Sequence, residues 1–238
     1  MKTAGFGIFE TMRFCRGKTV YFDAHLQRLA SSARRLRIKL PLALPKLKNL
    51  ISQEVKASGL KDAYLRLTIF GSPKKEFELL IKKYTPCTPA KYKKGFRVCI
   101  SDLRQDQNSI FPRHKTTLRQ IYETSYQKAL KNGFAEALLL NQKEYLTEAS
   151  RSNIFWAKDG KLFTPGLSCG CLNGITRKAI IGLARKFGLT VCQGKFFISD
   201  LKQADEAFLT NSLIGIMPLS GYGRRITNFL QEKYKILV

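Results

Sequence analysis

The sequence lacks a long apolar run and any cysteine pair at metal-binding spacing. No window approaches the about 18 apolar residues of a membrane span, and the N-terminus, Met-Lys-Thr-Ala-Gly-Phe-Gly, lacks the apolar run of a signal peptide. Because the cysteines stand at 15, 87, 99, 169, 171 and 192, no C-x-x-C site exists, and we expect reduced thiols and no metal. These absences predict a soluble, cytoplasmic protein.

Acidic residues are also few. Only 17 Asp and Glu oppose 42 Lys and Arg, which leaves a formal net charge of +25 and a field that attracts anions. The basic residues form short clusters, such as Lys74-Lys75 and Arg224-Arg225, and no zinc-finger, basic-zipper or aromatic RNA-binding signature accompanies them. We therefore expect solvated basic faces, a small anionic substrate and no specific nucleic acid. Polyanion or nucleic-acid binding stays a distant alternative.

What is present favours an α+β (mixed α/β) protein, with 44% hydrophobic residues among 238. Apolar residues at helical spacing predict one helix with Asp23 as its N-cap that stops at Pro41, and another from Pro45 to Gly59. A third passes through residues 122–130 before Gly133, and a fourth has Thr176 as its cap and stops at Gly188.

Short apolar segments with turn residues between them predict the strands. They are residues 63–70 and 76–83, joined by a Gly-Ser-Pro turn at 71–73, then 96–101 and 136–140, and a hairpin of 152–157 with 161–164. The hairpin turns at Asp159-Gly160, a dipeptide that tolerates the positive φ angles such turns need.

A polar stretch between Asp102 and His114 interrupts these patterns. We place the domain boundary there, with an N-terminal α/β domain at 1–102, an interdomain linker at 103–114 and a C-terminal domain at 115–238.

Three segments contain residue types suited to catalysis or binding. Lys115 stands where the linker meets a helix, Glu148 stands between two apolar strands, and Gly174-Ile175-Thr176 begins a helix whose free N–H groups suit a phosphate. Each has an ordinary alternative when taken alone: a surface lysine, a turn carboxylate and one helix start among many.

The order and spacing of these segments resemble the aminotransferase class IV family, the fold-type IV pyridoxal 5′-phosphate (PLP) enzymes. Nine short motifs along nearly the whole chain carry the resemblance. They are residues 5–13 (GFGIFETMR), 25–29 (HLQRL), 114–116 (HKT), 136–141 (EALLLN), 147–148 (TE), 152–155 (SNIF), 164–165 (TP), 174–177 (GITR) and 209–212 (LTNS). The resemblance implies a two-domain fold of the D-amino-acid aminotransferase type, with PLP as its cofactor.

The resemblance also assigns roles to individual residues. Lys115 matches the lysine that holds PLP as a Schiff base and moves protons, and Glu148 matches the carboxylate that faces the pyridine nitrogen. The resemblance assigns binding of the cofactor phosphate to Arg28, Ile175, Thr176 and Ser212. Arg66, in an apolar strand, could meet a substrate carboxylate or pair with a neighbouring acid, and Arg119 and Asn211 are further substrate-binding candidates.

Within the family, the motifs favour aminodeoxychorismate lyase, which forms 4-aminobenzoate for folate synthesis and releases pyruvate. Thr11 stands where branched-chain enzymes tend to have Gly, His114-Lys115-Thr116 resembles the lyase version of the lysine motif, and the chain is short. Branched-chain or D-amino-acid aminotransferase remains the alternative. Leu118 departs from the Asn of several relatives, and about twenty residues usually precede the opening motif, so an edge strand is missing or the native start lies upstream. The resemblance further implies a homodimer.

Overall fold

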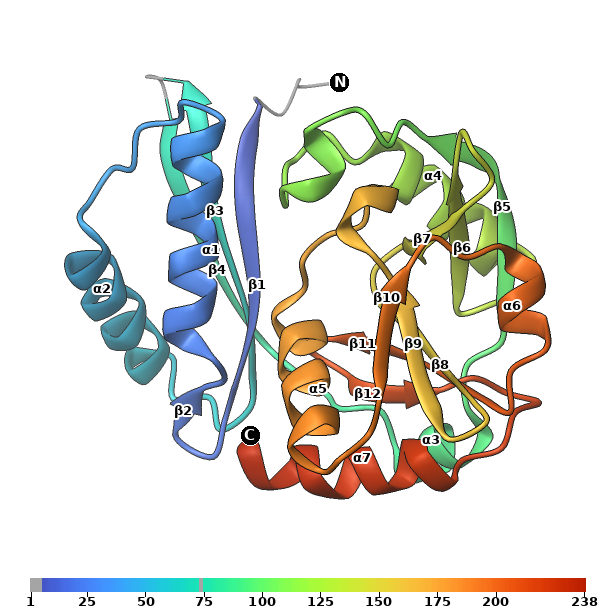
Figure 1. Cartoon of the computed structure of the whole chain (residues 1–238). Coiled ribbons are helices and arrows are strands. Elements are labelled where there is room, and N and C mark those ends of the chain that lie inside the picture. Colours follow the sequence, from blue (N-terminus) through green and yellow to red (C-terminus); the bar gives the residue numbers. More distant parts are fainter. Residues whose placement is uncertain (1–5, 73–74) are drawn as a thin grey trace. The chain divides into compact units, whose positions relative to one another are not determined.

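The computed structural model describes residues 6–72 and 75–238, which fold into two compact units (Figure 1). The first unit contains the residues up to Pro86 together with His114–Leu118. The second contains Cys87–Arg113 and Arg119–Val238. The stretch that we predicted as a linker therefore lies mostly within the second unit, where it includes the end of β5 (Val98–Gln105) and the short 3-10 helix η1 (Phe111–Arg113).

The first unit is an antiparallel sheet covered by two helices. The strand order is β2 (Lys18–Thr19), β1 (Gly7–Cys15), β3 (Ala63–Ser72) and β4 (Lys75–Lys83). Successive side chains of a strand point to opposite faces, so each of these strands contributes to both. One face packs against the apolar sides of α1 (Phe22–Arg35) and α2 (Leu44–Ala57) (Figure 1). Its core includes Ile8, Met12, Leu65, Leu67 and Ile69.

The two predicted helices of this unit are confirmed, but one predicted cap is wrong. The N-cap of α1 is Tyr21, in the left-handed region at φ 50°, whereas Asp23 lies in the first turn. The Asp23 carboxylate is used differently, because Lys48 Nζ of α2 donates to it at 2.5 Å. The helix also ends before Pro41. Gly5 of the opening motif and Pro73 of the predicted turn lie outside the described residues.

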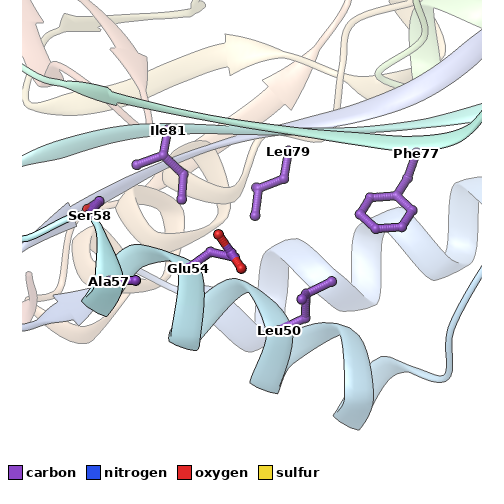
Figure 2. Close-up of a pocket in the computed structure, with 7 residues that line it drawn as sticks. All are labelled: Leu50, Glu54, Ala57, Ser58, Phe77, Leu79 and Ile81. Atoms are coloured by element: carbon purple, nitrogen blue, oxygen red, sulfur yellow. The ribbon is translucent and has the colours of Figure 1, made fainter.

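An apolar groove lies between α2 and β4 in the first unit (Figure 2). It has a volume of about 620 Å³ and is lined by Leu50, Glu54, Ala57, Ser58, Phe77, Leu79 and Ile81. The three residues of β4 belong to the sheet face that α1 and α2 cover. None of the predicted site residues lines this groove. We therefore regard it as part of the packing between the helices and the sheet, and not as the candidate active site.

The second unit contains two sheets. The order of the five-stranded sheet is β10 (Val191–Gly194), β9 (Lys161–Pro165), β8 (Asn153–Lys158), β11 (Glu206–Asn211) and β12 (Gly215–Pro218), and that of the three-stranded sheet is β5, β6 (Glu136–Asn141) and β7 (Leu146–Ala149). Besides η1, its helices are α3 (Pro89–Lys94), α4 (Gln120–Lys131), η2 (Leu167–Cys169), α5 (Ile175–Lys186), α6 (Ile198–Lys202) and α7 (Arg225–Leu237). The predicted mixed α+β class is confirmed.

Local conformation confirms one turn and corrects one cap. Asp159 and Gly160 have φ angles of 48° and 72°, as the predicted hairpin turn requires. Helix α5 has Gly174 as its N-cap, so Thr176 is its second residue and not the predicted cap. A Cβ at Gly174 would lie 2.0 Å from Asn153 Oδ1, which explains why glycine occupies this position. Among the described helices, none is long and apolar enough to cross a membrane.

Candidate functional site

Lys115 is held at the beginning of β1, within the first unit. Phe9 N–H donates to Lys115 O at 2.8 Å, Thr117 N–H donates to Gly7 O at 2.8 Å, and Gly7 N–H donates to Thr117 Oγ1 at 3.0 Å. These bonds keep the Lys115 backbone beside the strand as a short antiparallel bridge. The Lys115 ammonium lies 4.8 Å from the centre of the Phe9 ring, so the strand also places its side chain.

The face of the sheet that carries Phe9 gathers polar and cationic side chains. Thr11 pairs with Arg66 across β1 and β3, and Phe9 pairs with Thr68, so these side chains share one face. The Arg66 guanidinium lies 4.0 Å from the centre of the Phe9 ring, and within the described ranges it makes no ion pair with a carboxylate. Two cations thus lie against one ring, an arrangement that attracts an anion.

The opposite face of β1 contains a charged cluster. Arg28 of α1 donates to Glu10 through Nε at 2.8 Å and through Nη2 at 2.6 Å, and His25 Nδ1 lies 2.7 Å from the same carboxylate. Glu10 and His25 are buried, with exposed fractions of 1% and 0%. The predicted phosphate-binding arginine is therefore oriented by a carboxylate that our sequence analysis did not assign. A glutamate within the apolar Ile8–Met12 segment was the available signal.

Burial and the neighbouring charges shift the pKa values of Glu10 and His25. Burial would raise the pKa of Glu10, but the charge and hydrogen bonds of Arg28, with the hydrogen bond of His25, lower that pKa to about 2. Burial lowers the pKa of His25 more than its bond to Glu10 raises it. His25 is therefore neutral at pH 7, and its Nδ1–H donates to the ionised Glu10.

Glu148 is the central carboxylate of the second unit. It lies in β7 with 4% of its surface exposed. The Tyr122 hydroxyl of α4 donates to Glu148 Oε1 at 2.8 Å, and Asn153 Nδ2 donates to Oε2 at 3.1 Å. Burial, followed by the negative charge of Glu148, raises the pKa of Tyr122 well above its usual value, so the phenol stays protonated and remains a donor.

Asn153 connects this carboxylate to the beginning of α5. Its Nδ2 also donates to Leu172 O at 2.9 Å, just before the Gly174 N-cap. Ile175 and Thr176 form the first turn of α5, where unpaired N–H groups and the helix dipole favour an anion. The buried Thr176 Oγ1 has no hydrogen-bond partner among the described residues, as expected for a site that a ligand oxygen completes.

The remaining candidates of the second unit have specific contacts. The Arg119 guanidinium lies 4.0 Å from the centre of the Tyr122 ring and donates to Ser150 O at 3.1 Å. Asn211 Nδ2 donates to Ser152 Oγ at 3.0 Å, while Asn211 Oδ1 accepts from the N–H groups of Leu213 and Ile214. The Asn211 amide therefore shapes the turn that contains Ser212.

The candidate residues are divided between the two units. The first unit holds Arg28, Arg66 and Lys115, and the second holds Arg119, Glu148, Ile175, Thr176, Asn211 and Ser212. Sequence analysis did not assign the roles of Glu10, Tyr122 and Asn153. The groups present suit PLP: Glu148 can accept from a protonated ring nitrogen, the α5 N-terminus can bind a phosphate, and Lys115 provides an amine.

Comparison with known proteins shows the family of this chain. The model of the family described as amino-transferase class IV matches residues 7–222. A branched-chain-amino-acid aminotransferase of Pseudomonas aeruginosa is 29% identical over 98% of this chain and 84% of its own length. An aminodeoxychorismate lyase of Bacillus subtilis is 27% identical over 97% and 85%. A branched-chain aminotransferase structure from Thermoproteus uzoniensis, determined with norvaline, has a TM-score of 0.88 and 26% identity, covering 98% and 85%.

Proposed function

Because this chain belongs to the amino-transferase class IV family, we propose that it is a PLP-dependent aminodeoxychorismate lyase, which converts 4-amino-4-deoxychorismate to 4-aminobenzoate and pyruvate. It is an enzyme of the lyase or aminotransferase type, and PLP is its cofactor. The supporting observation for the lyase is the Arg66 guanidinium, which lies 4.0 Å from the centre of the Phe9 ring on the sheet face shared with Thr11 and can meet a substrate carboxylate.

Cofactor binding is assigned to individual residues in this proposal. Arg28 of α1 binds the phosphate together with the N–H groups of Ile175 and Thr176 and the hydroxyl of Ser212. The Glu148 carboxylate accepts a hydrogen bond from the pyridine nitrogen and keeps its proton there. Glu10 orients the Arg28 guanidinium, since two of its donors already point at that carboxylate.

When bound, PLP supplies a ring that withdraws electrons from the carbon next to the substrate nitrogen. Lys115 Nζ removes the proton from that carbon, after which the C–O bond to the enolpyruvyl group breaks and the substrate ring becomes aromatic. Lys115 can also return the proton or release the product amine, because its backbone is fixed beside β1.

Substrate charge explains the two further arginines. The lyase substrate has two carboxylates, and we assign Arg66 of the first unit and Arg119 of the second as their partners through charge-assisted hydrogen bonds. An aliphatic amino acid has one carboxylate and needs one such partner. Asn211 supports the Ser212 turn and is assigned to substrate binding only through that turn.

A product assay tests the reaction. Purified enzyme supplied with PLP and 4-amino-4-deoxychorismate should release pyruvate and 4-aminobenzoate in equal amounts, while branched-chain amino acids with 2-oxoglutarate react much more slowly. Faster transamination than elimination would contradict the lyase assignment. It would leave the cofactor residues as they are, because both reactions use them.

The second candidate is a branched-chain aminotransferase, supported by the Pseudomonas aeruginosa relative, whose identity of 29% is close to that of the lyase relative. D-Amino-acid transamination belongs to the same alternative. For either reaction we propose a small anionic substrate, a homodimer and a cytoplasmic location. We assign no specific nucleic-acid partner, and any binding of polyanions should weaken steeply with salt.

A further inference from the structure

We propose that Tyr122 is a positioning residue for Glu148, and that its hydroxyl orients this carboxylate and stabilises its ionised form, which favours the proton on the cofactor nitrogen. This inference rests on the PLP part of the proposed function and is independent of whether the reaction is elimination or transamination.

Both oxygens of the Glu148 carboxylate accept a hydrogen bond. Tyr122 is buried in the first turn of α4, and its hydroxyl donates to Glu148 Oε1 at 2.8 Å. The second oxygen, Oε2, accepts from Asn153 Nδ2 at 3.1 Å. Each carboxylate oxygen therefore has a donor from a different element, α4 for one and β8 for the other. A carboxylate held at both oxygens has a defined orientation for a third donor.

The Tyr122 ring is itself fixed. Arg119, the N-cap residue of α4, covers it with its guanidinium 4.0 Å from the ring centre, and Arg119 also donates to Ser150 O at 3.1 Å. Burial and the Glu148 charge hold the Tyr122 phenol in its protonated form. The hydroxyl therefore stays protonated near neutral pH and donates to Glu148. It does not act as a base toward the proton of the cofactor nitrogen.

The direction of the effect follows from hydrogen bonding to the charged form. A donor on Oε1 stabilises ionised Glu148 and makes it a weaker base. A weaker base leaves more of the shared proton on the ring nitrogen, where its positive charge increases electron withdrawal. Removing the hydroxyl should therefore shift the proton toward Glu148 and slow the removal of the substrate proton by Lys115.

The same contacts also admit a simpler role, in which Tyr122 is a core aromatic residue whose hydroxyl merely needs a partner. In that role, loss of the hydroxyl changes stability but leaves the protonation of the cofactor nitrogen unchanged. The two roles are therefore separated by a readout at that nitrogen, and not by activity alone.

The decisive variant is Tyr122→Phe in the PLP-loaded enzyme, with PLP labelled with ¹⁵N in its ring. The matched control is Tyr126→Phe, one turn along α4, whose ring is likewise covered by an arginine, Arg151, at 3.9 Å. We expect Tyr122→Phe to bind PLP about tenfold more weakly, because a hydrogen bond to a charged group is lost. Its ¹⁵N resonance should move toward that of unprotonated pyridine, and exchange of the substrate α-proton should slow about tenfold, whereas Tyr126→Phe changes neither.

An unchanged ¹⁵N resonance with unchanged proton exchange in Tyr122→Phe would overturn the proposal. If this variant does not fold, 3-fluorotyrosine at position 122 keeps the ring and makes its hydroxyl a stronger donor, and an unchanged resonance there overturns the proposal equally. Wild-type protein that binds no PLP would overturn the proposed function and this inference with it. Wild-type protein that binds PLP but lacks lyase activity would contradict the lyase assignment alone.

Discussion

Glu10 of the first unit and Glu136 of the second are both buried carboxylates, with exposed fractions of 1% and 3%, but their pKa values move in opposite directions. Burial raises both. For Glu10 the charge and hydrogen bonds of Arg28, together with the contribution of His25, outweigh burial and lower the pKa to about 2. For Glu136 the donors are the Ser152 hydroxyl at 2.6 Å and Arg151 N–H at 2.7 Å, and its pKa stays raised. A direct cation, more than the number of hydrogen bonds, decides the sign.

The same physical rule applies to Glu148. Its two donors, Tyr122 and Asn153, are a phenol and an amide, so in kind they resemble the neutral donors of Glu136. A protonated ring nitrogen would be a direct cation beside Glu148, as the guanidinium of Arg28 is beside Glu10, and would stabilise the ionised carboxylate in the same way. The first unit thus has cations at Phe9 and at Glu10, while the second unit has the Glu148 carboxylate, the N-terminal N–H groups of α5 and the Arg119 guanidinium.

The largest expected effect is loss of the Lys115 amine from the first unit. Lys115→Ala should lower both lyase and aminotransferase rates by about 10⁴-fold or more, since amine exchange and proton transfer have no other candidate. The visible absorption band of the bound cofactor should also be lost. Lys131→Ala, at the exposed end of α4, is the control and should keep both. Residual activity near the wild-type value would remove Lys115 from the mechanism.

Neutralising the central carboxylate of the second unit should have the next largest effect. Glu148→Gln should still bind PLP but slow proton abstraction by about 10²- to 10³-fold, because an amide does not keep the ring nitrogen protonated. Single-turnover measurements of substrate proton exchange give this rate. Glu144→Gln, whose carboxylate is more than half exposed beside Arg104, provides the control. Equal rates in wild type and Glu148→Gln would contradict the assignment.

Acid should weaken the first unit through Glu10. Because its folded pKa is depressed, the stability it contributes is present above about pH 4.5 and is lost as the pH falls toward about 2. A shift of this size corresponds to about 3 kcal/mol. Urea unfolding between pH 5 and 2.5 should show this loss for wild type and a smaller pH slope for Glu10→Gln. A Glu54→Gln control, at the groove of Figure 2, should retain the wild-type slope.

The smallest expected effect comes from Glu136, whose contribution to stability should change with pH in the direction opposite to that of Glu10. Its folded pKa is raised, so its contribution is full below about pH 4.5 and is lost as the pH rises through the folded value. Glu136→Gln should lose about 1 kcal/mol from its weakened bonds to Ser152 and Arg151 N–H, together with that pH dependence. Unfolding curves compared at pH 4.5 and 7 measure both. The same slope in both proteins would contradict the comparison with Glu10.

Local sequence patterns predicted much of the fold. Apolar periodicity located α1, α2, α4 and α5, and the Asp159-Gly160 turn followed from the backbone preferences of its two residues. Asp23 and Thr176, the two residues wrongly predicted as caps, lie in the first turn of their helices, and residues distant in the sequence contact both helix starts. Lys48 of helix α2 donates a hydrogen bond to the Asp23 carboxylate. Asn153 of strand β8 lies so close to Gly174 that only glycine fits there. A single segment does not reveal such partners.

The sequence by itself determined the mixed α+β class, the family and the candidate residues Lys115 and Glu148, because short motifs and their spacing are local properties. Tertiary structure decided that His114–Leu118 joins β1 in the first unit, since that pairing links residues more than one hundred positions apart. It also decided the partners of the buried carboxylates. Arg28 for Glu10, and Tyr122 with Asn153 for Glu148, become neighbours only when helices pack on strands, and burial then makes each hydrogen bond consequential.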